Sequence, residues 1–208
     1  MRYFNSLPSI INADNQNNLY TLKNLVTRSK LVSTLAKNPL VFYNYSIQDT
    51  DTPEIIAHKY YEDSYRYWLV LLANEYMDPQ WSWPLNSKQF TEYLTDKYKT
   101  EAGTQPVLEY TQTTVHHYEK LITSYDDGTQ VTTIKNIIIG EKEYNDMVEK
   151  EYTNRFNYGD NIKYTLTKKS VSIYDYEYQL NESKRNIKLI NSIYIPEIEL
   201  QFQVLMGT

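Results

Sequence analysis

The sequence predicts an α+β protein with a small strand–helix–helix domain between less compact segments. Three patterns lead to this prediction: a strand-like run before a strong helix start, helical spacing in two further stretches, and an Asp-Gly pair within a β-rich region. We divide the chain into an extended N-terminal arm, the βαα(β) domain with a following helix, a β-rich middle segment with a hairpin and a helix, and a charged C-terminal helical segment. These segments cover residues 1–38, 39–100, 101–160 and 161–208.

The composition excludes several classes of protein. The chain has 208 residues, a net charge of −5 and no cysteine, which excludes disulfide scaffolds, thiol nucleophiles and cysteine-based zinc sites. No apolar run approaches the ~20 residues that a membrane-spanning helix needs. With a pI of 5.3, the chain also lacks the basic character of a nucleic-acid binder. We therefore expect neither a membrane nor a nucleic acid as a partner.

Charge is unevenly distributed along the chain. Residues 1–40 carry a net charge of +4, and residues 41–154 carry −10. Such segregation favours oriented contacts between proteins. The 22 tyrosines against 5 phenylalanines suit half-buried interfaces, although codon bias in an AT-rich genome would produce the same excess.

The first elements are read from local composition. The Asn-rich stretch 12–18 predicts a loop, and residues 27–32 favour extended structure because β-branched residues alternate with polar ones. The aromatic and β-branched run 40–47 predicts a strand.

A helix is expected to begin directly after this strand. Pro53 suits the first helical position, and Asp51 or Thr52 can cap the helix. Glu54 in the first turn favours the helix dipole. The pattern ends near Tyr61.

Two further helices are expected before residue 101. Residues 65–76 place Trp68 on a broad apolar face, and residues 88–100 show apolar side chains at helical spacing. Between them, residues 78–85 are expected to be extended because they contain two prolines.

The second half of the chain is predicted from weaker patterns. Residues 107–140 indicate β structure with a hairpin turn at the Asp-Gly pair. Residues 141–156 predict a helix, and so does the charged stretch 171–192. Residues 197–206 form a terminal element whose type the pattern leaves open.

No catalytic residue, cofactor site or metal site is predicted. The chain lacks the phosphate-binding, zinc-hydrolase and serine-hydrolase motifs. Adjacent His116 and His117 would point to opposite faces of a strand, and His58 has no second ligand one helical turn away. We therefore expect a protein that is not an enzyme.

Trp81 and Trp83 are candidate binding residues. On one face of an extended segment they could stack on a sugar ring or anchor a protein partner. In the alternative, one ring belongs to the core and the other covers the helices. The sequence leaves both interpretations open.

A family resemblance rests mainly on stretches between Leu40 and Tyr98. They are DTPEIIA at 51–57, YYED at 60–63, YWLVLLAN at 67–74, DP at 78–79 and WPL at 83–85, with NLVTRSKL upstream at 24–31. This pattern resembles the LysM-like segment of the baseplate wedge protein fifty-three family of T-even-type contractile-tailed phages. Residues 178–190 are similar to the charged tail segment of that family, and the resemblance covers a little over half of the chain.

Two turn positions depart from the family pattern. The family usually has Gly where Thr50 and Glu62 stand here. These turns must therefore avoid positive φ or accept strain.

The resemblance implies a LysM-like βαα(β) domain and a structural role in the virion. The chain would be made in the host cytoplasm, join wedge proteins in the tail baseplate and link neighbouring wedges around the central hub. Its partners would be other wedge subunits and neighbouring wedges, with no small-molecule substrate. The alternative is a LysM module that binds peptidoglycan or chitin.

Protein-interface residues are expected on the basic flanks and at the tryptophan pair. The flanks, residues 1–38 and about 155–208, are expected to be ordered by partners and mobile alone. The reason is that the Asn-rich stretch 12–18 and the charged stretch 171–192 offer too few apolar side chains to offset backbone entropy. The predicted interface residues are Arg28, Lys30, Trp81, Trp83, Lys184, Arg185 and Lys188.

Overall fold

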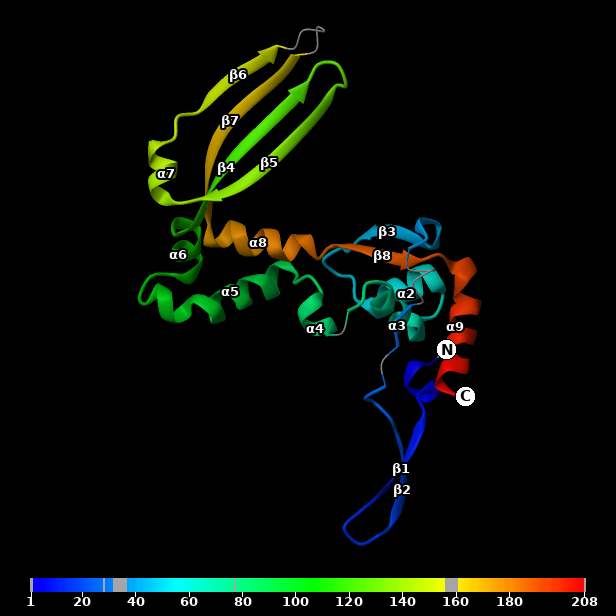
Figure 1. Cartoon of the computed structure of the whole chain (residues 1–208). Helices are drawn as coiled ribbons and strands as arrows, with labels where there is room; N and C mark the ends of the chain where they lie inside the picture. The colour runs from blue at the N-terminus through cyan, green and yellow to red at the C-terminus, as the bar shows by residue number, and fades with distance from the viewer. Residues whose placement is uncertain (1, 28, 32–36, 77, 156–160, 208) are drawn as a thin grey trace. The chain divides into compact units, whose positions relative to one another are not determined.

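The computed structural model describes residues 2–27, 29–31, 37–76, 78–155 and 161–207. The chain forms two compact units: unit 1 comprises Met1–Asn86 and Asn181–Thr208, and unit 2 comprises Ser87–Leu180. Helices and small antiparallel sheets occur in the structure (Figure 1), which confirms the predicted α+β class. No helix within the described ranges is long and apolar enough to cross a membrane.

Unit 1 contains a strand–helix–helix–strand arrangement that the C-terminal part of the chain completes. Strand β3 (Phe42–Ser46) precedes α2 (Pro53–Tyr61) and α3 (Tyr67–Ala73), and β8 (Asn186–Ile190) pairs antiparallel with β3 (Figure 1). The other elements of unit 1 are η1 (Tyr3–Ser6), β1 (Ser9–Ala13), β2 (Leu19–Lys23), η2 (Pro39–Val41), η3 (Ser64–Arg66), α4 (Pro79–Ser82), η4 (Ser192–Tyr194) and α9 (Ile195–Met206).

The pairing of β3 with β8 corrects the helix expected over residues 171–192. Only α8 (Ile173–Ser183) is helical there, and residues 186–190 are a strand. Ile187 and Leu189 alternate with polar neighbours and are buried in the core of unit 1. The strand forms because it pairs with β3. Since β3 lies far away in the sequence, the local pattern did not reveal this pairing.

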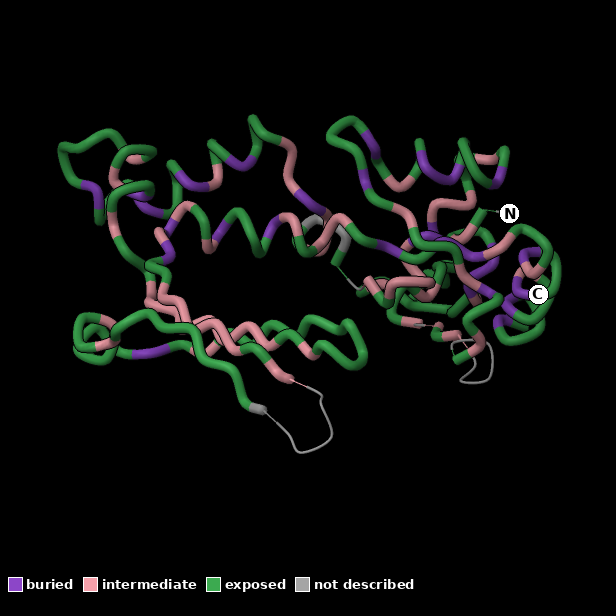
Figure 2. The backbone as a smooth tube through the Cα atoms, turned by 90° about the horizontal axis from the view of Figure 1, so that it is seen from above, coloured by how far each residue is buried: buried purple, intermediate pink, exposed green. Residues whose placement is uncertain are grey.

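The core of unit 1 gathers apolar side chains from both ends of the chain. Figure 2 shows buried residues close to the labelled N and C termini. Buried members of this core include Leu7, Val41, Ile47, Ile56, Leu69, Val70, Ile187, Leu189, Ile190, Ile195, Ile198, Phe202 and Met206. The expectation that the charged stretch 171–192 offers too few apolar side chains is therefore wrong for residues 187–190. These side chains pack against distant elements, which the local composition does not reveal.

The predicted start of the first helix is confirmed. Oγ1 of Thr52 accepts a hydrogen bond from the amide of Ile55 at 3.3 Å, and Pro53 occupies the first turn. The helix ends at Glu62, whose φ of 57° is left-handed. Thr50 does not have a positive φ, so Glu62 is the one of the two turn positions that accepts strain.

Replacing Glu62 by glycine is expected to raise the free energy of unfolding by about 0.5–1 kcal/mol, because glycine lacks the Cβ that disfavours this conformation. Denaturant-induced unfolding of the full chain measures the change. The matched control is Glu62→Ala, which removes the charge but keeps the Cβ and should not stabilise the protein. Equal stability of the two variants would contradict backbone strain at this turn.

Unit 2 combines a four-stranded antiparallel sheet with helices. Its strand order is β5-β4-β7-β6, and the carboxylate of Asp126 accepts a hydrogen bond from the amide of Gly128 at 2.9 Å in the predicted hairpin turn. The elements are α5 (Ser87–Ala102), α6 (Val107–Thr113), β4 (Val115–Asp126), β5 (Val131–Ile139), α7 (Glu141–Asp146), β6 (Lys150–Arg155) and β7 (Asn161–Ser172), followed by α8. The hairpin and the third predicted helix, α5, are thus confirmed.

Two expectations in unit 2 are wrong. Residues 107–113 are helical, not extended, because Pro106 precedes them and Glu109 lies in the first turn, both of which favour a helix start. The helix expected over 141–156 ends at Asp146 and gives way to β6. Pairing with β7 stabilises that strand and stacks the rings of Tyr152 and Tyr164 at 5.0 Å between centroids.

Residues 78–85 are also not fully extended. Pro79–Ser82 form one helical turn, in which the amide of Ser82 donates to the carbonyl oxygen of Asp78 at 3.0 Å. A proline at the first helical position is compatible with this turn because its missing N–H would have no partner within the helix.

Candidate interaction surfaces

The structure gives little evidence on whether the two basic residues of the N-terminal arm, Arg28 and Lys30, are interface residues. Arg28 lies outside the described residues, and the described part of 27–32 contains no strand. Nζ of Lys30 lies 3.0 Å from Oε1 of Glu75, and both side chains are mostly exposed. An ion pair this open contributes little to stability.

Arg185 makes its contacts within unit 1. Its guanidinium donates to the carboxylate of Glu182 at 2.8 Å, to the carbonyl oxygen of Ile47 at 3.1 Å and to the carboxylate of Asp49 at 2.6 Å. The hydrogen bond to Glu182 is the main cause that raises the pKa of Arg185. This residue therefore ties the end of β3 to the segment before β8.

Lys184 and Lys188 each make one side-chain contact with the described residues, and an ammonium group has three donors. Nζ of Lys184 donates to the carbonyl oxygen of Trp81 at 2.8 Å, and Nζ of Lys188 lies 5.8 Å from the ring centroid of Phe42. The backbone of Lys188 is fixed by the side chain of Asn74, with two hydrogen bonds of 2.8 Å.

The structure separates the two tryptophans. Trp81 lies on α4 and is 67% exposed. Trp83 packs against the core of unit 1, and its indole N–H donates to the carbonyl oxygen of Asp51 at 3.0 Å. They do not form a common platform on an extended segment, and Trp83 takes the core position of the second interpretation.

Asp51 is a buried carboxylate whose role the sequence analysis missed. It accepts hydrogen bonds from the hydroxyl of Tyr45 at 2.6 Å, Nζ of Lys59 at 2.6 Å and the amide of Gln48 at 3.0 Å. Burial is the largest influence and opposes ionisation, but these hydrogen bonds together lower the pKa of Asp51. The carboxylate therefore orders the turn between β3 and α2, while Thr52 caps the helix.

Hairpin β1–β2 exposes apolar side chains on both faces. Every residue of both strands is exposed. Ile10 pairs with Leu22 on one face, whereas Ile11 and Leu19, which are 73% and 74% exposed, share the other face. These strands pair only with each other among the described strands, and a lone two-stranded hairpin is marginally stable in water.

The base of this hairpin is fixed to unit 1. Nζ of Lys23 donates to the carbonyl oxygens of Asn5 at 3.0 Å and Leu7 at 2.8 Å. At the other end, Asp14 accepts hydrogen bonds from the amides of Gln16 and Asn18, both at 2.8 Å. The loop expected over 12–18 is thus correct for the turn, but its first two residues belong to β1.

Helix α9 carries apolar side chains on two sides. Ile198 and Phe202 face the core of unit 1. Leu200, Val204 and Leu205 are mostly exposed, and the first two lie one helical turn apart. This outer stripe is a second uncovered apolar surface in unit 1.

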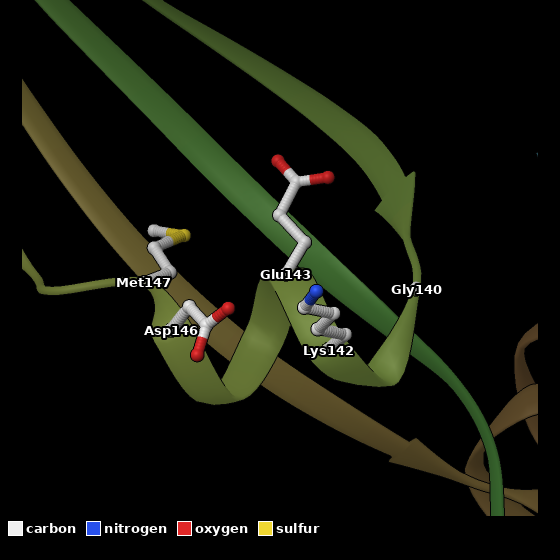
Figure 3. A pocket seen from close by; sticks show the side chains of 5 residues that line it. All are labelled: Gly140, Lys142, Glu143, Asp146 and Met147. Carbon is white, nitrogen blue, oxygen red and sulfur yellow. The ribbon is translucent and has the colours of Figure 1, made fainter.

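A shallow hollow in unit 2 does not resemble a ligand site. It has a volume of about 660 Å³ and is lined by Gly140, Lys142, Glu143, Asp146 and Met147. Figure 3 shows that these residues come from α7 and the two positions that flank it. The hollow is wide open to solvent, whereas ligand sites are concave and enclose most of the ligand.

The structure corrects the expectation for His116 and His117. The register of β4 with β7 is interrupted between Val115 and His117. The two Nδ1 atoms lie 2.8 Å apart, so the rings meet instead of pointing to opposite faces. In the described part of the chain, no three or more His, Asp or Glu side chains form a cluster that could hold a metal ion.

Comparison with known proteins gives two matches. The model of a family described as Base plate wedge protein 53 matches residues 13–198. Baseplate wedge protein gp53 of Enterobacteria phage T4 is 29% identical over 87 residues, which is 42% of this chain and 43% of that relative. The second match therefore spans less than half the length of the relative.

Proposed function

The chain belongs to the base plate wedge protein 53 family, and from this premise we propose that it joins wedge proteins and links neighbouring wedges around the central hub through hairpin β1–β2. Membership makes it a non-enzymatic structural component of the baseplate wedge in the phage virion, with other baseplate proteins as partners. The proposal concerns which surface makes the contacts.

The observation that carries this proposal is the apolar exposure of the hairpin. Side chains such as Ile11 and Leu19 gain about 25 cal/mol per Å² when a partner removes them from water. Leu7 lies in the core of unit 1, and Lys23 binds its carbonyl oxygen, so the base of the hairpin is already fixed. Little of the free energy gained by burying the apolar side chains is therefore lost in ordering the base on binding.

Replacing Ile11 by aspartate is expected to weaken binding to the other wedge proteins at least tenfold, because a charge would be buried in an apolar contact. Binding of the full chain to the purified wedge proteins of the same phage measures the effect. Leu19→Asp, on the same face, should act similarly.

The matched control is Ile134→Asp, since Ile134 is an exposed isoleucine on β5 in unit 2. It should leave binding unchanged if the hairpin makes the contact. Circular dichroism establishes that all variants remain folded. Equal binding by Ile11→Asp, Leu19→Asp and the unaltered chain would exclude the hairpin as the interface.

We further propose that β3, α2, α3 and β8 form a LysM-like unit into which unit 2 is inserted along the sequence. The strand–helix–helix–strand order and the antiparallel pairing of β3 with β8 support this assignment. The basic residues near β8, together with exposed Trp81, would then be further contacts to neighbouring subunits.

Carbohydrate binding is the second candidate function, and the exposed ring of Trp81 is the observation that favours it. Trp83 is held by Asp51 and the core, so a sugar would find one ring instead of two. Calorimetric titration with peptidoglycan or chitin oligomers is therefore expected to show no saturable binding. Saturable binding that Trp81→Ala abolishes would support a carbohydrate-binding module.

A further inference from the structure

We propose that His116 and His117 bind a divalent transition-metal ion, such as Zn²⁺ or Ni²⁺, through their two Nδ1 atoms. The site lies at the start of β4 in unit 2. Two imidazole nitrogens already meet there, 2.8 Å apart. Each ring is also held by another side chain, which restricts its motion before a metal arrives.

An irregularity in the strand brings the rings together. Val115 pairs with Ser172 and His117 pairs with Val171, so His116 is an extra residue in β4. A bulge of this kind interrupts the alternation of side chains and re-aims one of them. For this reason, adjacent histidines that would be separated in a regular strand share one side here.

Glu119 fixes the orientation of His117. Its Oε1 lies 3.3 Å from Nε2 of His117, and both side chains are largely buried, at 16% and 14% exposure. A carboxylate accepts hydrogen bonds, so Nε2 carries the hydrogen and Nδ1 of the neutral ring keeps its lone pair. A carboxylate behind the imidazole is the arrangement that orients histidine ligands in metal sites.

Tyr176 restrains the ring of His116. The two rings are stacked, with centroids 3.9 Å apart and planes 9° apart. The same tyrosine contacts the ring of His117 edge-on at 5.8 Å. Rotation of either imidazole away from the shared point would break one of these contacts.

Metal binding requires a small rearrangement of this pair. If Nδ1 of His117 keeps its lone pair, the 2.8 Å contact requires Nδ1 of His116 to donate its hydrogen to it. A metal can accept a lone pair from each ring only if the hydrogen of His116 moves from Nδ1 to Nε2 of the same neutral ring by exchange with water, so no net proton is released. Two ligands at 2.0–2.1 Å in tetrahedral geometry lie about 3.4 Å apart, so the nitrogens must separate by about 0.6 Å.

The donor set selects the class of metal. Imidazole suits zinc, copper and nickel, whereas magnesium and calcium prefer oxygen ligands. Water would fill the remaining coordination positions, since a metal needs more than the two nitrogens. Such a site would bind more weakly than a structural site with four protein ligands.

Isothermal titration calorimetry of the full chain with zinc chloride at neutral pH tests the proposal. One zinc ion per chain is expected to bind saturably. His116→Ala and His117→Ala should each weaken binding at least tenfold, and Glu119→Gln should weaken it about tenfold through the lost orientation of His117. His58→Ala removes the third histidine, on α2, and should leave binding unchanged.

The proposal is overturned if zinc fails to saturate the chain at millimolar concentration, or if either His116→Ala or His117→Ala binds like the unaltered chain. A second measurement needs no variant and covers the case of a misfolded one. In nuclear magnetic resonance spectra, zinc should shift the imidazole signals of two histidines and leave those of the third in place. Shifts of all three, or of none, would equally contradict the site.

Discussion

Replacing Trp68 by alanine is expected to lower the free energy of unfolding by about 3–5 kcal/mol, because it empties a large aromatic site in a core. The indole is 4% exposed. It lies against the ring of Tyr3 at 5.7 Å and the ring of Phe202 at 4.9 Å between centroids. The substitution therefore removes contacts that join the N-terminal turn, α3 and the C-terminal helix.

Two matched variants sharpen this test. Trp81→Ala removes the same side chain from an exposed position and should change the free energy of unfolding by less than about 0.5 kcal/mol. Trp68→Phe keeps most of the ring and removes an N–H for which the described residues provide no hydrogen-bond partner, so it should cost much less than Trp68→Ala. Denaturant-induced unfolding followed by far-ultraviolet circular dichroism measures all three. A loss below about 1 kcal/mol for Trp68→Ala would place Trp68 outside the core.

Replacing Glu177 by alanine is expected to lower the free energy of unfolding of unit 2 by about 2–3 kcal/mol. The buried carboxylate on α8 accepts hydrogen bonds from three side chains of α5: Nζ of Lys97 at 2.6 Å and the hydroxyls of Tyr98 at 2.7 Å and Tyr93 at 3.2 Å. Alanine would leave these donors without their acceptor. Lys97 is 44% exposed and can regain water, which keeps the loss below that of a fully buried pair.

The pH dependence distinguishes the charge of Glu177 from its packing. Burial is the largest influence and opposes ionisation, but hydrogen bonds from Lys97 and Tyr98 outweigh it and lower the pKa of Glu177 from its ordinary value of 4.5. Because the unfolded chain takes up the proton first as pH falls, this contribution is complete at neutral pH and is lost in acid. The stability difference between the unaltered chain and Glu177→Gln should therefore shrink below about pH 4.5. A constant difference would contradict a role for the charge.

Elements whose structure is determined by residues close together in the sequence were predictable. Thr52 and Pro53 mark the start of α2 through contacts within one turn, and the Asp-Gly pair marks the hairpin through its own backbone. The spacing of Phe90 and Leu94 likewise identifies α5. In each case, the residues that determine the structure are close together in the chain.

Elements that depend on distant partners were not predictable. The lysine and arginine residues near β8 suggest a solvated helix, but Ile187 and Leu189 are buried by elements from the other end of the sequence. The bulge that joins His116 and His117 arises from the pairing of β4 with β7. Neither pairing leaves a signal in the residues beside it.

The candidate interface was only partly predictable. Because the stretch 12–18 is polar, the sequence analysis predicted a loop there and did not predict the hairpin. The apolar residues on either side of it, at Ile10–Ile11 and Leu19–Leu22, together indicate two paired strands. Charge alone did not reveal that Arg185 forms ion pairs with Glu182 and Asp49 within unit 1, and its interface role stays a prediction. The interface role of the other predicted residues stays a prediction.

Hydrogen exchange on the free chain and on the chain assembled with the other wedge proteins tests the central claim most directly. We expect amides of residues 9–23 to exchange quickly in the free chain, because the two strands pair only with each other among the described strands and all their residues are exposed. They should become strongly protected on assembly, while amides of α2 and α3 are protected in both states. Equal exchange of residues 9–23 before and after assembly would contradict the hairpin as the contact that holds this subunit in the baseplate.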